Sequence, residues 1–497
     1  MSNFQSGDDR QAIPRWHLSD NARIFSQEPS NKIRLKNTEH NEESVREWKA
    51  CKSLDTATDL IVRHELFEDF PIDVTIEASK FILDSADQAK YLQLSTASKI
   101  LGINQNQDVI KANNSTRKEI FGHKIGQLRA LCREFPRDAF IWSDLGFCYG
   151  ALGRDDDAKK CLTVAINLAP NSALVVRAYA RLLVHLGEYE EALQRIQSLR
   201  GLRTDPLILS VDIAIRERFK LGGIQVREAR KFVGDESFHP ARLSELRSAL
   251  GTLEFNSGRS HRAKKLINES LKCASENAVT QAIWLRDSKE FNLDFDAESL
   301  TPEAEAKAIE YYFGENYDQS VNSLIAFYDF QPFSDSPLVD ATYIRTFCQD
   351  DPKGALKLGK EFSIDKANSF SVRNNLTVAA ILTNDIKLAE EFLAQVVPSE
   401  LSAVETNIHL ATTGLFAFKI SAPEQGRVLY DRAIDYFKKT GNRNAQARAL
   451  YYYALAELDY DKERSLILAS QSQRISNAIG YRQMDTKLEK IIAEISK

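Results

Sequence analysis

The sequence of 497 residues predicts an all-α fold made of repeated pairs of antiparallel helices. Two observations favour this class. Residues 139–172 contain two stretches of apolar and small residues at helical spacing, separated by a glycine and closed by a proline. The small residue of the second stretch then recurs along the chain, with one exception, at intervals equal to or slightly longer than this 34-residue unit.

The unit AFIWSDLGFCYGALGRDDDAKKCLTVAINLAPNS contains the residue types that a tight helix pair requires. Gly146 and Ala158 are small at the point where the two helix backbones come closest. Gly153 ends the first helix, because a left-handed φ costs a residue with a Cβ more than it costs glycine. Pro170 ends the second helix, because proline supplies no amide and clashes with the preceding turn. One such pair cannot bury its own apolar face, so further copies are expected.

The unit resembles the tetratricopeptide (TPR) repeat. The residues in register with that repeat are Trp142, Leu145, Gly146, Tyr149, Ala158, Leu162, Ala165 and Pro170. The resemblance implies an α-α superhelix, a TPR-type solenoid whose first helices line a concave groove. It also implies a protein that binds other proteins and performs no chemistry of its own.

Degenerate copies of the unit are expected to continue to about residue 480. The small residue of the second helix recurs at Ala158, Ala192, Ala229, Ala263, Ser320, Ala355, Ala389, Gly426 and Ser465. The one long interval, from Ala263 to Ser320, includes the acidic, turn-prone stretch EFNLDFDAESLTPE. This stretch marks either a junction between two blocks of repeats or a long loop inside one continuous superhelix.

Four regions are therefore expected. They are a flexible, disordered N-terminal arm at 1–55, an N-terminal helical region at 56–138, a first TPR block at 139–291 and a second TPR-like block at 301–497. The arm is rich in Asn, Ser, Gln, Glu and Arg and has no periodic apolar pattern. Its aromatic residues, Trp16 and Trp48 among them, leave open a short docking motif beside a plain unstructured tail.

Composition and motifs exclude several classes of function. The net charge is −5, with 65 basic and 70 acidic residues, so nucleic acid is not expected as the main ligand. The apolar runs are too short to span a membrane. The N-terminus does not resemble a signal peptide and the six cysteines form no CxxC motif, so we expect a cytoplasmic protein with free thiols. Catalytic, nucleotide-binding and metal-binding motifs are missing, so no enzyme activity, cofactor or metal site is expected.

The TPR resemblance gives the positions that would face the groove. The residues expected to contact a partner there are Phe140, Phe147, Arg177, Arg181, Tyr312, Phe347 and Phe418, and Leu415 also points inward. Arg177 and Arg181 are four residues apart on one helical face, so together they could hold a carboxylate or phosphate. Alternatively, the pair is solvated and neutralised by Glu188 or Glu190.

Two classes of function remain open. The first is a cytoplasmic interaction scaffold or adaptor, whose apolar, aromatic groove binds a helix or an extended peptide of a partner protein. The second is a ligand-responsive regulator or sensor subunit of a multi-protein signalling or defence system. Such sensors carry an effector or DNA-binding domain at one end, and no such domain is recognisable in this sequence.

Overall fold

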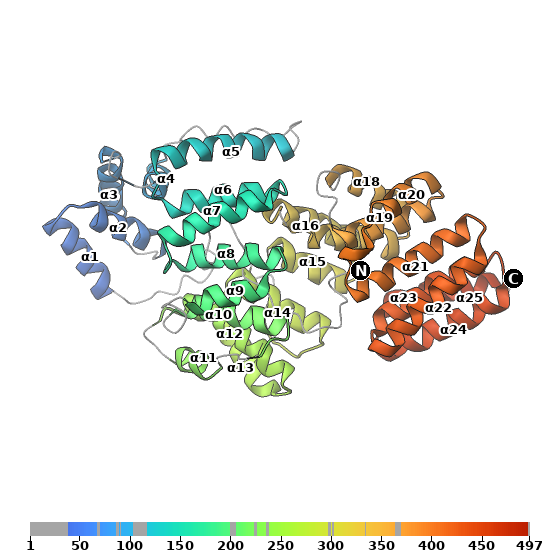
Figure 1. Ribbon diagram of the computed structural model, residues 1–497. Helices are drawn as coiled ribbons and strands as arrows, with labels where there is room; N and C mark the ends of the chain where they lie inside the picture. Colours follow the sequence, from blue (N-terminus) through green and yellow to red (C-terminus); the bar gives the residue numbers. More distant parts are fainter. Residues whose placement is uncertain are drawn as a thin grey trace. The chain divides into compact units, whose positions relative to one another are not determined.

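The computed structural model describes 38–66, 70–85, 89, 91–102, 117–198, 205–222, 226–234, 238–296, 300, 303–332, 334–362 and 369–495 (Figure 1). All regular structure within these ranges is helical, which confirms the predicted all-α class. The described chain divides into two compact units. The first unit extends to Ala306 and includes 330–333, and the second unit comprises the remainder from Lys307 onward.

Four helices at the start of the described chain share a small core of their own. They are α1 (Thr38–Ala50), α2 (Leu54–Leu66), α3 (Ile72–Asp84) and α4 (Tyr91–Ile100). Trp48 of α1 is 1% exposed, and its ring meets the edge of Phe81 with 5.3 Å between centroids. The structure thus differs from the expected flexible arm at 38–50, because Trp48 and the half-buried Val45 pack this otherwise polar helix against the core. The rest of that arm, 1–37, lies outside the described residues.

Helix pairs make up the rest of the first unit. The pairs are α6 (Ala139–Ala151) with α7 (Asp155–Leu168), α8 (Ala173–His185) with α9 (Tyr189–Ser198), α10 (Pro206–Arg218) with α11 (Val226–Val233), and α12 (Pro240–Asn256) with α13 (Ser260–Ser270). Helix α5 (Arg117–Glu134) packs on α6 before the first pair. A 3₁₀ turn (Leu271–Cys273) and the single helix α14 (Glu276–Ser288) follow the last pair, so the long interval seen in the sequence contains an unpaired helix.

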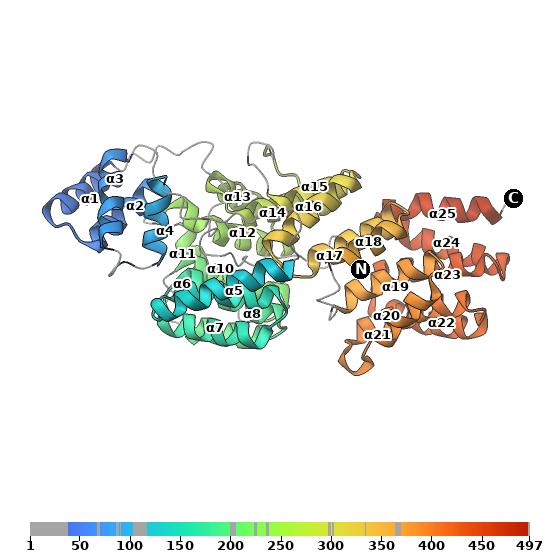
Figure 2. The ribbon, with the colours of Figure 1, turned by 90° about the horizontal axis from the view of Figure 1, so that it is seen from above.

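The second unit is also built of pairs, which follow one another in chain order (Figures 1 and 2). The pairs are α15 (Ala304–Phe313) with α16 (Tyr317–Phe330), α17 (Ser336–Tyr343) with α18 (Pro352–Phe362), α19 (Phe370–Leu382) with α20 (Ile386–Ala394), α21 (Ala403–Lys419) with α22 (Pro423–Thr440), and α23 (Arg443–Glu457) with α24 (Lys462–Ile479). Helix α17 continues into a π-helical turn (Ile344–Cys348), a 3₁₀ turn (Pro398–Glu400) precedes α21, and α25 (Arg482–Ile495) ends the unit.

The small residues found in the sequence all lie on second helices and are buried. A Cβ added to Gly146 would lie 3.2 Å from the carbonyl oxygen of Ala158, so α6 and α7 touch through their backbones. Serine replaces alanine twice. The Ser320 hydroxyl donates to the Ala308 carbonyl at 2.8 Å, and that of Ser465 donates to the Ala454 carbonyl at 2.7 Å. Each buried hydroxyl therefore gains a partner on the first helix of its own pair, which makes serine acceptable in a site built for alanine.

A left-handed residue joins the two helices of most pairs. The residues with positive φ in these turns are Gly153, Gly187, Lys220, Gly258, Glu315, Asp350, Asn384 and Ser421. Except for Lys220, each precedes the small residue of its second helix by five positions. The turn therefore keeps one backbone shape even where the sequence no longer carries glycine, which is why the later copies are hard to recognise.

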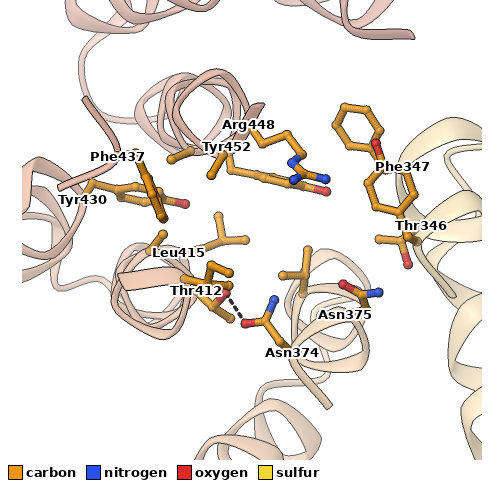
Figure 3. A pocket seen from close by; sticks show the side chains of 16 residues that line it. Thr346, Phe347, Asn374, Asn375, Thr412, Leu415, Tyr430, Phe437, Arg448 and Tyr452 are labelled. Atoms are coloured by element: carbon orange, nitrogen blue, oxygen red, sulfur yellow. Dashed lines mark hydrogen bonds between the residues drawn. The ribbon is translucent and has the colours of Figure 1, made fainter. Parts of the chain in front are cut away.

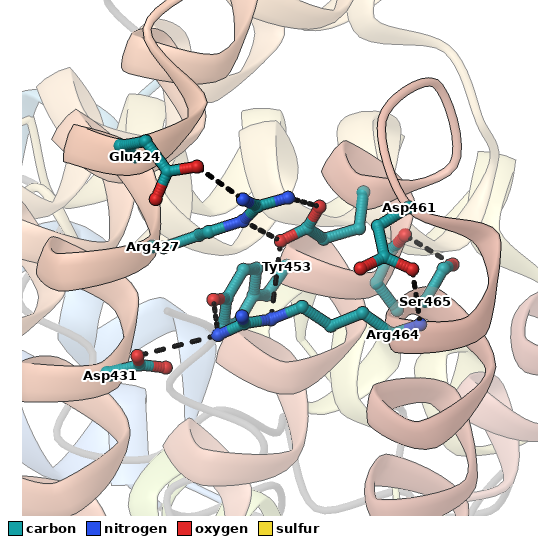
Figure 4. Close-up of polar contacts among 9 residues, drawn as sticks. Glu424, Arg427, Asp431, Tyr453, Asp461, Arg464 and Ser465 are labelled. Carbon is teal, nitrogen blue, oxygen red and sulfur yellow. Dashed lines mark hydrogen bonds and ion pairs between the residues drawn. The ribbon is translucent and has the colours of Figure 1, made fainter.

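A network of ion pairs joins the last two pairs of the second unit (Figure 4). Glu457 at the end of α23 is fully buried, and both of its oxygens accept hydrogen bonds from Arg427 of α22, at 2.8 and 2.9 Å. Arg464 of α24 lies 3.4 Å from the same carboxylate and donates to the Tyr453 hydroxyl at 2.6 Å. One buried carboxylate thus connects three consecutive helices through charge-assisted hydrogen bonds.

We expect Ala158→Leu to lower the free energy of unfolding by about 1–3 kcal/mol, because the larger side chain must separate α6 from α7. Lys160→Leu is the matched control, since the Lys160 side chain is 77% exposed on the same helix. Urea unfolding of both variants measures the effect. Equal destabilisation would contradict the close approach at Ala158.

The turn geometry gives a second expectation. Glu315→Gly should raise the free energy of unfolding by about 0.5–1 kcal/mol, because Glu315 holds a φ of 59° that glycine adopts without a Cβ clash. Gly153→Ala should lower it by about 1 kcal/mol for the opposite reason. A Cβ at Gly153 would meet no heavy atom within 4 Å, so backbone strain alone is measured. Opposite signs in thermal unfolding support the shared turn, and the same sign for both would refute it.

Candidate functional site

A pocket opens among the first helices of the second unit (Figure 3). Its lining comes from the end of α17 with its π-helical turn, and from α19, α21 and α23, while α22 adds the rings of Tyr430 and Phe437. The space not filled by protein atoms is about 650 Å³, open mouth included. Because solvent at the mouth is included, this figure is an upper bound on the space that a ligand could occupy. The pocket is the candidate binding site of the second unit.

The π-helical turn forms one end of this pocket. Thr346 and Phe347 are successive residues of the turn, and both line the pocket. The Phe347 ring stacks on Tyr343, with centroids 5.3 Å apart, and meets the edge of Tyr451 at 5.6 Å. A π-helical turn interrupts the regular spacing of an α-helix and is frequent at functional sites. Here it supplies two neighbouring side chains to one wall.

Helix α25 packs behind the same wall. The hydroxyls of Tyr343 and Tyr481 share a hydrogen bond, and Lys487 forms an ion pair with Asp350. Burial by itself would raise the pKa of Asp350, but hydrogen bonds from Lys487 and Lys490 keep that pKa below its usual value. The second helix pair and the last helix of the second unit are thus joined by contacts between residues that are 137 or 138 positions apart.

The polar groups of the pocket have fixed orientations. Thr412 donates a hydrogen bond of 2.7 Å to the side-chain oxygen of Asn374, so the amide nitrogen of Asn374 remains as a donor. The Asn375 amide nitrogen donates to the Val339 carbonyl at 2.9 Å. Arg448, which is 9% exposed, is the only charged residue of the lining, and its guanidinium lies 5.5 Å from the centre of the Tyr343 ring.

The opposite end of the pocket is apolar. Phe437 and Tyr430 lie there, away from Thr346 and Phe347 (Figure 3). Leu415 is 3% exposed and forms part of the lining between the two ends. The pocket thus has one apolar end and one polar end, and it carries a single positive charge.

In the first unit, the residues expected in the groove have other surroundings. The Arg177 side chain is buried against Glu245 of α12: Nη2 donates to Oε1 at 2.7 Å, and Nη1 lies 2.7 Å from Oε2. Its acidic partner is therefore Glu245 and neither Glu188 nor Glu190. Arg181 is half-buried one turn further along α8. Phe147 is 3% exposed with its centroid 6.5 Å from that of Phe121, which belongs to α5, and Phe140 is half-buried.

In the second unit, the expected residues also divide. Phe347 and Leu415 line the pocket. Tyr312 is fully buried, with its ring against the edge of Phe313 at 5.2 Å. Phe418 is 3% exposed and packs among aromatic side chains, with its centroid 5.9 Å from that of Tyr453. Only two of these side chains are therefore placed to touch a ligand in the pocket.

Arg448 is the main pocket residue that was not predicted from the sequence. Counting back from the small residue of the second helix gives the inward positions, and this works for Leu415, because three residues separate α21 from α22. Four residues separate α23 from α24, so the inward face of α23 is displaced from the counted positions. The signal available was an arginine beside three tyrosines, in the stretch ARALYYYALAEL.

The described residues also bear on the expected thiols, metal binding and membrane crossing. All six cysteines are free, as expected, and burial raises the pKa of the Cys132 thiol to about 11. Among the described residues, no three His, Cys, Asp or Glu side chains cluster closely enough to hold a metal ion. None of the described helices combines the length and the apolar character needed to cross a membrane.

The helix pairs, their small crossing residues and their left-handed turns define a TPR-type helical repeat fold. Neither a protein-family model nor a curated protein sequence matches the chain.

Solved structures resemble it only loosely. Yeast Tom70 is 13% identical, with 76% of this chain and 93% of that chain covered and a TM-score of 0.35. The anaphase-promoting complex hetero-tetramer Cut9-Hcn1 is 13% identical, with 91% and 95% covered and a TM-score of 0.41. The Naa15/Naa10 complex bound to HypK-THB is 14% identical, with 89% and 68% covered and a TM-score of 0.21.

The buried ion pair of the first unit can be tested by a double-mutant cycle. We expect Arg177→Met to lower the free energy of unfolding by about 3–5 kcal/mol, because it leaves the Glu245 carboxylate buried without its cation. Arg177→Met combined with Glu245→Leu should recover most of that loss. Urea unfolding gives all the required values. Additive losses in the double variant would show that the two side chains do not depend on each other.

Proposed function

We propose that the chain is a non-enzymatic, cytoplasmic interaction protein, a scaffold or adaptor that binds a short segment of a partner protein in the pocket of the second unit. The observation that carries this proposal is the origin of the lining: the first helices of successive pairs face one common space. A TPR-type array uses that face for partner binding. In the first unit, the expected anion-binding residue Arg177 is already paired with Glu245, so it is not available to a partner.

The size of the pocket favours an extended segment over a helix. An α-helix with its side chains is about 10–12 Å wide and rises 5.4 Å per turn. Even with its open mouth included, the space of about 650 Å³ would hold no more than roughly one to one and a half turns of such a helix. A few residues of extended peptide fit the same space and leave their backbone carbonyls within reach of a donor. The amide nitrogen of Asn374 is such a donor.

A ligand-responsive regulator is the second candidate, and the contacts of α25 favour it. Phe347 contacts the ligand space on one side, and on the other its ring centroid lies 6.0 Å from that of Tyr481, which immediately precedes α25. A ligand that moves Phe347 would therefore disturb the packing of the last helix. Such coupling is what a sensor requires, because binding must favour one arrangement of the protein over another.

Selection of peptides from a random library displayed on phage, with the full chain as target, tests the proposal. Selected peptides should bind the wild type and lose at least tenfold in affinity for Ala411→Phe, because the new ring fills the pocket from a half-buried position of its lining. Ala403→Phe is the matched control on the same helix, since Ala403 is exposed and lies outside the lining. Fluorescence anisotropy of labelled peptides gives the affinities. Peptides that bind Ala411→Phe as well as the wild type would refute the pocket as the binding site.

A further inference from the structure

Buried basic side chains normally have an acidic partner in this protein. Within the described residues, four of them are at most 9% exposed, and three form ion pairs with a carboxylate. Those three pairs are Arg177 with Glu245, Arg216 with Asp212, and Lys487 with Asp350. Arg448 is the fourth, and no described carboxylate forms an ion pair with it. A buried cation without a counter-charge is costly, so its position calls for an explanation.

Two unsatisfied polar atoms face the same space. Nη1 of Arg448 and Oγ1 of Thr346 are both buried without a hydrogen-bond partner, and both residues line the pocket. They come from different elements, α23 and the π-helical turn. Figure 3 shows the guanidinium of Arg448 directed toward the end of the pocket where Phe347 and Thr346 lie. Together the two atoms form a donor set that the protein itself does not use.

We propose that this donor set receives the carboxylate of a ligand that has an apolar body, with the carboxylate on Arg448 and the body toward Phe437. The proposal rests on the pocket of the proposed function and adds the chemistry of its occupant. The guanidinium can hold a carboxylate through parallel hydrogen bonds, and the Thr346 hydroxyl can donate another. Contact with Leu415 and Phe437 favours an apolar body at the far end.

The charge of the lining selects a monoanion. Arg448 is the only cation of the lining, and Lys487, whose ammonium lies 5.1 Å from the Phe347 ring centre, is already paired with Asp350. A phosphate with two negative charges would keep one of them uncompensated in a largely buried site. A carboxylate is neutralised completely. It can belong to the C-terminus of an apolar peptide or to a small organic acid, and these two sources share the chemistry that the pocket recognises.

Thermal unfolding of the full chain with matched acid and neutral probes tests the proposal. The first probe set compares octanoate with octanamide. The second compares a pool of N-acetylated tripeptides of Leu, Val and Phe, as free acids, with the same tripeptides as C-terminal amides. We expect at least one acid to raise Tm by 2 °C or more above its neutral counterpart. Stabilisation by the peptide acids identifies a peptide C-terminus as the source, and stabilisation by octanoate identifies a small acid. Equal effects of acid and neutral probes in both sets would overturn the proposal.

The variants assign the effect to Arg448. Arg448→Met should abolish the difference between acid and neutral probes, and Arg448→Lys should retain part of it. Arg432→Met, at an exposed position of α22, should leave the difference unchanged. Without probe, Arg448→Met should melt no lower than the wild type, because a buried unpaired charge has been removed. A marked drop in Tm would show that Arg448 stabilises the fold instead and would overturn the proposal.

Ala411→Phe separates this inference from the proposed function. In one outcome, amide peptides bind the wild type as well as their acids do, and Ala411→Phe excludes both. That result would support the peptide pocket and refute the carboxylate site. Acid probes that stabilise Ala411→Phe as strongly as the wild type would refute the pocket itself. Acid probes that are excluded by Ala411→Phe and lose their advantage in Arg448→Met support both.

Discussion

The close approach of two helix backbones within each pair is the constraint on which the whole structure depends. Only glycine, alanine or a serine that finds a carbonyl partner fits at the crossing, as at Gly146, Ala158 and Ser465. Because the turn that leads into the second helix has the same shape in most pairs, the small residue follows it there at a fixed distance. Crossing and turn together set the rotation of each first helix, and so decide which of its side chains face the pocket.

The sequence predicts this part of the fold well because the contacts involved are local. Gly153 and Ala158 lie five positions apart, so their relation is visible in the printed letters. The Arg177–Glu245 pair joins residues 68 positions apart, and nothing near Arg177 indicates it. Arg448 was missed for a different reason: counting back from Ser465, by the interval that connects Ala411 with Gly426, reaches Leu450 instead of Arg448. The helix at 38–50 was missed because only two of its apolar side chains, Val45 and Trp48, pack against the core, which is too few to form a periodic pattern.

Among the buried basic side chains of the described chain, three are compensated by a carboxylate and one is not. Glu457 compensates Arg427, Asp350 compensates Lys487, and each pair connects separate helices. These pairs hold neighbouring helices together, and the charges of their side chains are already compensated, so they are not available to a ligand. The guanidinium of Arg448 is held by aromatic neighbours alone, which orient it without neutralising it. Within the second unit, the buried cation that pairs with a carboxylate, Lys487, connects helices, whereas the buried cation that has no carboxylate, Arg448, is the one we propose to bind the ligand.

The contact of α25 with the beginning of the second unit changes how that unit can come apart. In an open array each repeat touches only its neighbours, so the terminal repeats fray first and unfolding proceeds inward in steps. Here the Tyr343–Tyr481 and Asp350–Lys487 contacts connect the last helix with the second pair of the unit. The last helix cannot leave without exposing the Phe347 ring, and the second pair cannot open without releasing α25. The second unit should therefore lose its structure cooperatively, as a globular domain does, in contrast to the gradual melting of a linear repeat.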